Sequence, residues 1–248
     1  HVAENAGFEA LFMKTMQYRE FSMELLEAVC GNRIQYDFAI VGGVARDLKA
    51  DTGGLILKRL ESFIPQLDEL VDIFQNNWTL SLKNKGAGAI TRDDAMRLNV
   101  VGPFARAAGL AVDVRNETEA LLPWKEVGFE MVTDTTGDVY ARNMVRLREL
   151  YVSVRMIRNI INGLPESALL AETKAFPDGE AVARLEAPRG ELFYYAKGNK
   201  TQVLERLKIK APTFSNIAAM VEAFEGNEYG SAPAIIASYD PCLSCTAR

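Results

Sequence analysis

The feature that most constrains the fold is one long stripe of apolar side chains in the second half of the sequence. Positions between 140 and 161 repeat with the alternation of three and four residues that one face of an α-helix requires. Gly163 and Pro165 follow directly, and both residue types commonly end helices. The sequence therefore predicts a helix of about six turns whose apolar face needs packing partners. The stripe consists of Tyr140, Met144, Leu147, Tyr151, Val154, Ile157 and Ile161.

Two further helices are predicted in the first half of the chain, and they are the natural partners of this stripe. Residues 8–29 carry one mostly apolar face and stop at Gly31, a residue type that often follows a helix end. Residues 57–74 repeat in the same way, although Pro65 lies inside and should kink or restart the helix. Thr91 should cap a short helix further on, because its hydroxyl can accept from backbone amides.

Beyond residue 181 the pattern changes to an alternation of period two, which is typical of β-strands. Residues 185–196 and 202–210 are predicted to form a hairpin around 197–200. A short helix is expected over 215–224 with Ser215 as its cap, and a short apolar strand over 234–238. The predicted fold class is mainly α with a small β element. We expect one domain over 1–248, helical over 1–165 and small α+β over 181–248.

Composition excludes several classes of function. There are 28 Lys and Arg against 33 Asp and Glu, so the net charge of −5 disfavours nucleic-acid binding. No apolar run approaches the length of a membrane span, and three cysteines do not form a disulfide framework. The single histidine is His1, which excludes an internal histidine base within this chain. The five arginines of the long helix are interpreted as a solvated face or as contacts with partners.

The chemistry of the sequence is concentrated at its end, where Cys242 and Cys245 are separated by two residues. Such a pair can bind one metal ion or form a redox disulfide. Structural zinc needs four ligands, and the only other cysteine, Cys30, fits a small core position in a helix. A redox pair of the thioredoxin type normally opens a helix after a strand, whereas this pair closes the chain. A zinc site and a thiol redox site remain as alternatives.

The longer string Asp-Pro-Cys-x-x-Cys-x-x-Arg, residues 240–248, resembles the C-terminal signature of nickel–iron (NiFe) hydrogenase large subunits. Other segments, in the same order along the chain, resemble the energy-converting, complex-I-like group of these enzymes. Complex I subunits of the same lineage lack the two cysteines, so their presence favours a hydrogenase. The segments are Gly31-Asn32-Arg33, Ile40–Asp47, Gly102–Gly109 with Asp113-x-Arg115, Gly137–Arg142, Glu186–Glu191 and Lys208–Pro212.

The resemblance implies a NiFe cluster whose iron carries cyanide and carbon monoxide. Cys242 would be a terminal thiolate on nickel that can take up a proton, and Cys245 would bridge nickel and iron. Thiolates suit such electron-rich metals. Two further cysteine ligands would come from an upstream Cys-x-x-Cys that these 248 residues do not contain.

The resemblance also implies a group of residues around the cluster. Arg189 would donate a hydrogen bond to cyanide, and Thr213 is the second candidate donor. Asp240 would pair with Arg189 and hold its guanidinium above the open metal position, while Pro188 would shape the same canopy. The catalytic set implied by the resemblance is therefore Arg189, Asp240 and Cys242.

The implied function is the reversible reduction of protons to dihydrogen with electrons from a ferredoxin-like donor. The partners implied are the missing N-terminal part of the large subunit, a small iron–sulfur subunit and membrane subunits, which would place the protein peripherally on the cytoplasmic face of a membrane. This chain alone should be an incomplete enzyme, cut at its N-terminus and ending at Arg248 as the processed family members do. The alternative is a complex-I-like electron-transfer or scaffold subunit without an active metal site.

Overall fold

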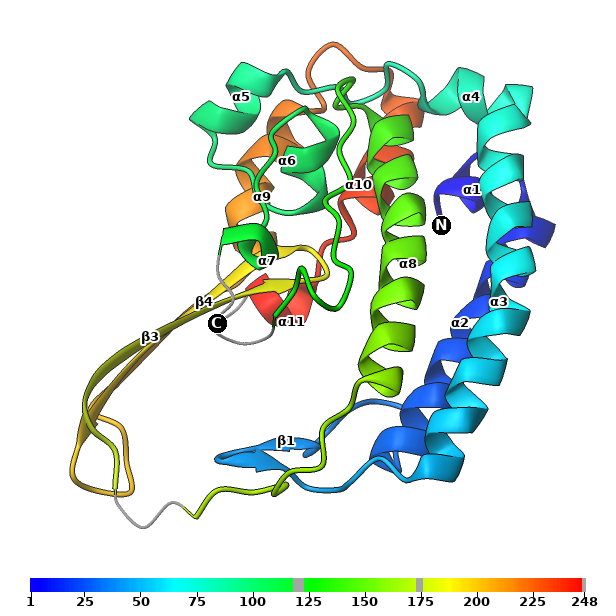
Figure 1. Cartoon of the computed structure of the whole chain (residues 1–248). Coiled ribbons are helices and arrows are strands. Elements are labelled where there is room, and N and C mark those ends of the chain that lie inside the picture. Colours follow the sequence, from blue (N-terminus) through cyan, green and yellow to red (C-terminus); the bar gives the residue numbers. More distant parts are fainter. Residues whose placement is uncertain (118–122, 173–175, 247–248) are drawn as a thin grey trace.

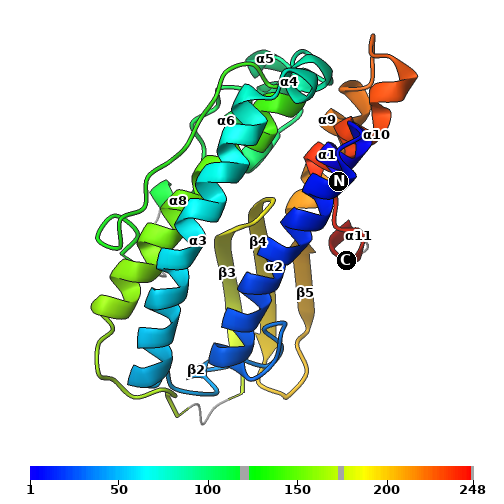
Figure 2. The same ribbon diagram turned by 90° about the vertical axis from the view of Figure 1, so that its right-hand side faces the viewer.

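Three long helices form one half of the molecule in the computed structural model, which describes residues 1–117, 123–172 and 176–246. They are α2 (Glu9–Cys30), α3 (Ala50–Asn76) and α8 (Val139–Asn162). Figure 1 shows the three helices side by side, and Figure 2 shows α3 between the other two, both of which it contacts. Leu60 and Leu67 of α3 share one apolar core with Leu147 and Val154 of α8. The stripe that begins at Tyr140 therefore has the partners that its sequence requires.

The ends of α2 and α8 agree closely with the sequence pattern, whereas α3 begins earlier than predicted. Helix α2 stops at Gly31, which has the left-handed φ of 75° that favours glycine. Helix α3 begins seven residues before the predicted apolar repeat and continues through Pro65 to Asn76. Pro65 thus neither ends nor restarts the helix, because packing along the whole length of α3 outweighs the loss of one backbone donor.

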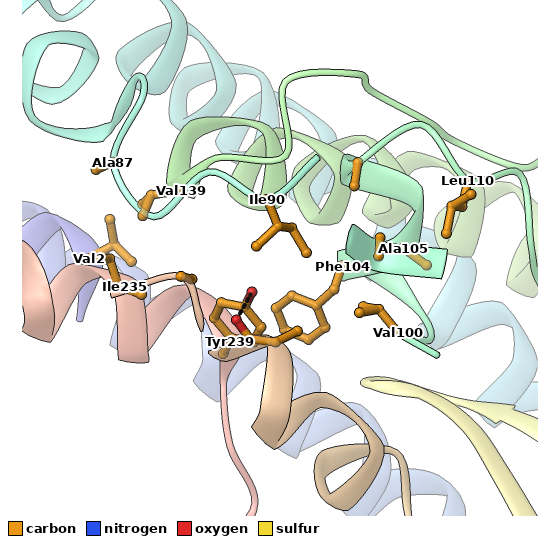
Figure 3. Packing of buried hydrophobic residues seen from close by; sticks show 14 residues of the cluster. Val2, Ala87, Ile90, Val100, Phe104, Ala105, Leu110, Val139, Ile235 and Tyr239 are labelled. Atoms are coloured by element: carbon orange, nitrogen blue, oxygen red, sulfur yellow. Dashed lines mark hydrogen bonds between the residues drawn. The ribbon is translucent and has the colours of Figure 1, made fainter. Parts of the chain in front are cut away.

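Short helices make up most of the second half. They are α1 (Val2–Asn5), α4 (Trp78–Asn84), α5 (Arg92–Arg97), α6 (Pro103–Ala107), α7 (Val114–Glu117), α9 (Pro212–Glu222), α10 (Ala232–Tyr239) and α11 (Leu243–Thr246), with a 3-10 turn at Tyr229–Ser231. Of these, α5, α6, α9 and α10 surround a separate apolar core. Thr91 caps α5 as predicted, since its hydroxyl accepts from Asp94 N at 3.1 Å. Figure 3 shows Phe104 of α6 lying against Tyr239 of α10; the two rings stack with centroids 4.2 Å apart.

Two small antiparallel sheets complete the fold, which is mainly helical as predicted. Strands β1 (Ala39–Ile40) and β2 (Gly43–Val44) form one hairpin. The larger sheet has the order β3-β4-β5, with β3 (Asp178–Ala187), β4 (Gly190–Asn199) and β5 (Arg206–Lys210), and projects from the body as an arm (Figure 1). The single-domain assignment and its internal boundaries stay predictions.

The predicted hairpin is correct in its second half and wrong in its first. Strands β4 and β5 are antiparallel neighbours, joined through residues 200–205. The predicted strand 185–196, however, consists of two strands that reverse direction at Pro188 and Arg189. Alternation of side chains continues across this tight turn, so the period-two pattern does not reveal it. The reversal places Arg189 at the inner end of the arm.

Two further elements also differ from prediction near the C-terminus. Residues 234–238 lie in helix α10 rather than in a strand, because a short apolar run fits either element and here packs on several sides. Ser215 does not cap α9: the helix begins three residues earlier at Pro212, and the Ser215 hydroxyl is buried without a partner in the described part of the chain. Proline suits the first turn of a helix because that turn leaves its amide positions unpaired.

Candidate thiol site

The thiol pair lies at the end of the chain, immediately after helix α10. Asp240 ends that helix in a left-handed conformation with φ of 48°, which redirects the chain towards Pro241. The two cysteines then lie on one short turn, where Cys245 N donates to Cys242 O at 3.0 Å. Both side chains are partly exposed and free of disulfide bonds. The geometry presents two sulfur atoms together on one side of a short helix.

The two thiols have different acidities. Hydrogen bonding with Cys245, and then with Ser244, lowers the pKa of Cys242 to about 7, and Arg189 contributes through its charge. The same contact with Cys242 raises the pKa of Cys245. Cys242 Sγ lies 3.2 Å from Ser244 Oγ. Cys242 is therefore the thiol that is more readily present as a thiolate, the form that binds metals.

Arg189 reaches the tail from the turn between β3 and β4. Its Nη2 lies 2.8 Å from Asp240 Oδ2, and its Nε donates to the carbonyl oxygen of the same residue. The ion pair expected from the sequence is therefore present. The backbone of Arg189 is held by Asn216 of α9, whose Nδ2 donates to the Arg189 carbonyl at 3.3 Å and whose Oδ1 accepts from Val101 N at 3.0 Å. Sequence reasoning did not find Asn216.

Thr213 and Pro188 also lie beside the tail. The hydroxyl of Thr213, in the first turn of α9, accepts a hydrogen bond from Cys242 N at 3.2 Å. Pro188, Arg189 and Cys245 contribute to the lining of a small cavity of about 120 Å³ whose other walls come mainly from the arm. All six candidate residues thus meet around the chain end. Arg248, which closes the family signature, lies outside the described residues.

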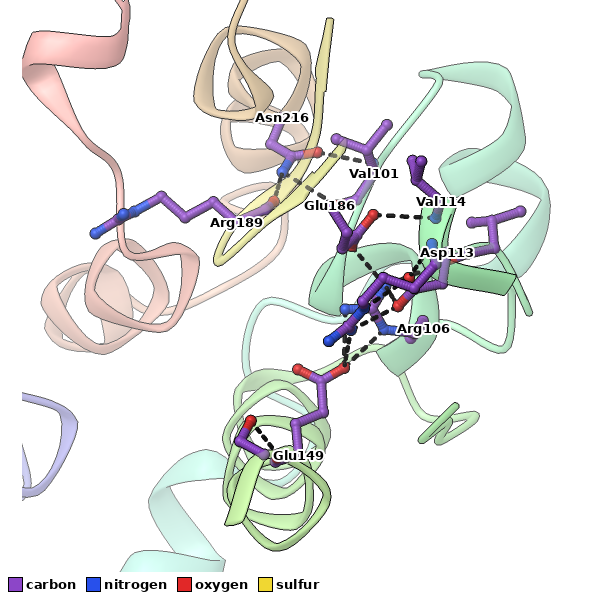
Figure 4. A network of polar contacts seen from close by, with 11 residues as sticks. Val101, Arg106, Asp113, Val114, Glu149, Glu186, Arg189 and Asn216 are labelled. Atoms are coloured by element: carbon purple, nitrogen blue, oxygen red, sulfur yellow. Dashed lines mark hydrogen bonds and ion pairs between the residues drawn. The ribbon is translucent and has the colours of Figure 1, made fainter. Parts of the chain in front are cut away.

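A buried ion network joins the root of the arm to the helices. Arg106 of α6 is 1% exposed and pairs at 2.8 Å with Asp113, with Glu149 of α8 and with Glu186 of β3 (Figure 4). Arg115 adds a second bond to Asp113 at 2.7 Å. Burial is the largest influence on both Glu149 and Glu186, and it raises the pKa of each. The network fixes where β3 starts its turn towards Arg189.

The interpretation of the arginines of α8 as a solvated face is wrong for two of the five. Arg142 is fully buried, and Arg146 is also enclosed, with its Nη2 atom shielded from solvent. Both side chains point to α10 and donate hydrogen bonds to Ser238. Arg148 and Arg155 do lie at the surface, where they pair with Asp134 and Glu130. Charge alone cannot separate these cases, because a buried guanidinium is rare but possible when it is hydrogen-bonded.

The donor set of this chain fits part of a metal centre. Two thiols held next to each other, one of them with a lowered pKa, are suitable ligands for soft, redox-active metals. The described residues contain no group of three or more His, Cys, Asp or Glu side chains that could hold a metal ion. The pair accordingly fits half of a four-thiolate site and needs ligands from elsewhere to complete it.

Comparison with known proteins places this geometry in context. The family described as "Respiratory-chain NADH dehydrogenase, 49 Kd subunit" matches residues 5–176 and 168–248. The chain is 37% identical to the carbon monoxide-induced hydrogenase of Rhodospirillum rubrum over all of its own length and 69% of that protein. It is 35% identical to the membrane-bound hydrogenase subunit alpha of Pyrococcus furiosus, again over its whole length and over 62% of the relative.

A solved structure shows the same fold. A chain of the membrane-bound sulfane sulfur reductase, an archaeal respiratory membrane complex, matches with a TM-score of 0.92 and 26% identity. The match covers 100% of this chain and 69% of that one. Proteins named as hydrogenase, NADH dehydrogenase and sulfane sulfur reductase subunits therefore resemble this chain, so the fold alone does not identify the activity.

These matches define the class of the protein as a subunit of oxidoreductase complexes. More specifically, the chain belongs to the family of the respiratory-chain NADH dehydrogenase 49 kDa subunit, which also includes the large subunits of energy-converting NiFe hydrogenases. It spans between 62 and 69% of the length of the two hydrogenase relatives. In the described part of the chain, every helix is too short or too polar to cross a membrane.

Proposed function

We propose that this chain is the C-terminal portion of a NiFe hydrogenase large subunit of the energy-converting type. The observation that supports it is the intact thiol pair, Cys242 and Cys245, gathered with Arg189 and Asp240 at one place. The identity to two proteins named as hydrogenases supports it independently. When bound, a NiFe centre supplies the reversible combination of two protons and two electrons to dihydrogen.

The residues of the chain have distinct parts in this proposal. Cys242 and Cys245 would each provide a sulfur ligand, and Cys242 Sγ is the atom that would take up and release a proton. Arg189 keeps its guanidinium beside the thiols through its two contacts with Asp240. It would donate a hydrogen bond to a cyanide ligand of iron when the centre is bound. Thr213 is the second donor. Its hydroxyl oxygen already accepts from Cys242 N, which leaves its own hydrogen available.

The remaining parts of the enzyme come from other segments in this proposal. An upstream Cys-x-x-Cys supplies the other two thiolates, and a small iron–sulfur subunit delivers electrons from a ferredoxin-like donor. Two relatives are named as parts of membrane-bound complexes, which supports membrane partner subunits and a peripheral position on the cytoplasmic face. The second candidate function is a complex-I-like electron-transfer or scaffold subunit, which the NADH dehydrogenase family match favours.

Metal analysis of the purified assembly tests the proposal. We expect close to one nickel per large subunit in the wild type, loss of nickel in Cys242→Ala, and unchanged nickel in the control Cys30→Ser. Cys30 is a suitable control because it is buried in α2, remote in sequence from the tail. Wild-type protein without nickel would support the scaffold function instead. Zinc, or a reversible disulfide between Cys242 and Cys245, would assign the pair to the zinc or thiol redox class.

A further inference from the structure

Two arginines of helix α8, the buried Arg142 and the half-buried Arg146, hold the segment that leads into the thiol pair. Arg142 and Arg146 are four residues apart, so their side chains leave the same face of the helix. Arg142 Nε donates to Ser238 Oγ at 2.9 Å, and Arg146 Nη1 donates to the Ser238 carbonyl oxygen. Both polar groups of Ser238 that face α8 are therefore occupied by guanidinium donors.

Aromatic rings complete the packing of the two guanidiniums. Arg142 lies 4.6 Å from the ring centroid of Tyr239, and Arg146 lies 5.1 Å from that of Phe104. The two rings stack on each other, as Figure 3 shows. Burial lowers the pKa of both arginines to about 10, which leaves both cationic at neutral pH. Within the described part of the chain, their hydrogen bonds go to hydroxyl and carbonyl oxygens rather than to carboxylates.

The contact made by Arg146 lies at the point where the chain leaves helix α10. The last carbonyl groups of any helix lack intrahelical donors, and a cation is favourable at that end of the helix dipole. Ser238 supplies one of these carbonyls, and the helix ends one residue later at Tyr239. Arg146 thus fixes the end of α10 just before the left-handed turn at Asp240 sets the course towards Cys242.

A second arginine holds the next part of the tail from a different element. Arg189, on the turn of the arm, donates to the carbonyl of Asp240 and pairs with its carboxylate. Arg146 and Arg189 therefore hold the carbonyls of residues 238 and 240. The negative charge of Asp240 raises the pKa of Arg146, whereas the positive charge of Arg189 lowers it. The two arginines and Asp240 form one electrostatic unit directly before the thiols.

We propose that Arg146 is a positioning residue for the thiol pair: by capping the Ser238 carbonyl, it fixes the direction in which residues 240–246 leave α10. Its connection to metal chemistry rests on the proposed function, but the positioning itself does not. A residue that served only the core would stabilise the whole molecule without any particular effect on the tail. A positioning residue must affect residues 238–246 more than the rest of the chain.

The test uses the purified full-length protein from cells grown without nickel and compares three variants. Arg146→Met removes the charge and the donor while keeping most of the apolar volume. Arg146→Lys keeps the charge but lacks the planar guanidinium, and so cannot reproduce its geometry. Arg148→Met is the matched control, because Arg148 lies two residues away on the same helix and contacts Asp134 at the surface. Two quantities are measured: amide hydrogen exchange of residues 238–246, and the alkylation rate of each cysteine by mass spectrometry.

In Arg146→Met we expect exchange in 238–246 and alkylation of Cys242 and Cys245 to rise about tenfold, while amides of α3 and the thiol of Cys30 keep their wild-type rates. Arg146→Lys should raise both quantities about threefold, and Arg148→Met should leave them unchanged. Wild-type rates at the tail in Arg146→Met would overturn the proposal, as would an equal rise throughout the chain, including Cys30.

The proposal stays testable if Arg146→Met does not fold, because Arg146→Lys keeps the buried charge. A tail that reacts at the wild-type rate in Arg146→Lys would then mean that Arg146 serves the fold alone. Failure of the proposed function has a different signature. Wild-type assembly that contains no nickel when it is purified from cells supplied with nickel would contradict the hydrogenase assignment and leave the exchange and alkylation results of all three variants unaffected.

Discussion

The planar guanidinium of Arg189 is held beside the thiols because it contacts both the carboxylate and the carbonyl of Asp240. A lysine amine at this position cannot make both contacts with the same geometry. In the complete enzyme we expect Arg189→Lys to keep its nickel and to lose hydrogen evolution by at least about tenfold, as loss of an oriented donor at a reacting centre does. Nickel content and hydrogen evolution from a reduced viologen dye are the measurements.

The control for this variant is Arg184→Lys. Arg184 lies on the same arm and pairs with Glu117 and Glu191, away from the tail. It should evolve hydrogen at the wild-type rate. Activity of Arg189→Lys within twofold of wild type would remove Arg189 from the site.

The buried carboxylates of the Arg106 network make stability depend on pH. Burial raises the pKa of Glu149 and Glu186, so the folded state holds their protons more tightly than the unfolded state does. Stability from this source is present below the ordinary pKa of 4.5 and is lost as pH rises through the higher folded value. In the wild type, one such carboxyl makes the free energy of unfolding fall by at most about 1.4 kcal/mol for each unit that the pH rises. We expect this fall to be less steep in Glu149→Gln.

Urea unfolding at several pH values between 4.5 and 7 measures this slope. Glu130→Gln is the matched control, because Glu130 is exposed and pairs with Arg155 of the same helix that carries Glu149. Its pH profile should run parallel to that of the wild type. A parallel profile for Glu149→Gln as well would mean that its carboxyl stays ionised in the folded protein over this range.

At the residue scale, the sequence predicted side chains that lie together in the structure, but not the residues that hold them in place. Arg189, Thr213 and Asp240 came from a family resemblance rather than from spacing, because residues so far apart in sequence give no periodic signal. Asn216 and Arg146 were missed for a physical reason. An amide in a short helix and an arginine in a basic helix are both most often solvated, and only the packing of α9 and α10 reveals their burial.

At the scale of elements, the approach of the arm to helix α6 depends on glycine. A Cβ on Gly102 would lie 2.5 Å from the Arg189 carbonyl and 2.6 Å from Gly190 N, and its φ of 73° disfavours other residues. We expect Gly102→Ala to destabilise the protein by more than the strained φ alone costs, which is about 1–3 kcal/mol. It should also lower hydrogen evolution, because Arg189 must move. Urea unfolding and activity are measured together.

Gly86→Ala separates the two effects. Gly86 has nearly the same φ, 77°, but open space where its Cβ would lie. It should lose only the conformational part of the stability and keep its activity. If the two variants lose the same free energy of unfolding and the same activity, the close approach of Gly102 to the arm does not contribute to either.

The elements predicted best from the sequence are those whose structure follows from their own local sequence pattern. Helices α2 and α8 have long amphipathic faces and recognisable ends, and both are found within a residue or two of the prediction. The turn at Pro188 and the helical state of 234–238 depended on tertiary packing instead. Short apolar runs have no preferred element until they have neighbours.

For the whole molecule, the fold is common to proteins of several activities, so the ligands must decide among them. Helix packing places α10 and the arm so that the two cysteines meet Arg189. It does not supply more thiols, because the three cysteines of this sequence include one in α2. Activity of the proposed site therefore depends on the segments that would supply its other ligands.

The last prediction concerns nickel binding by these 248 residues alone. The proposed NiFe cluster would use four thiolates, and only Cys242 and Cys245 are available here for it, on a segment that a bound metal would tie down. We expect the chain expressed alone to contain far less than one nickel per molecule and to evolve no hydrogen. Joining it to an upstream segment with a Cys-x-x-Cys pair, together with the maturation proteins, should restore both. A stoichiometric nickel in the isolated chain, measured by inductively coupled plasma mass spectrometry, would show that two thiolates and the residues around Arg189 suffice, and would contradict the four-thiolate site.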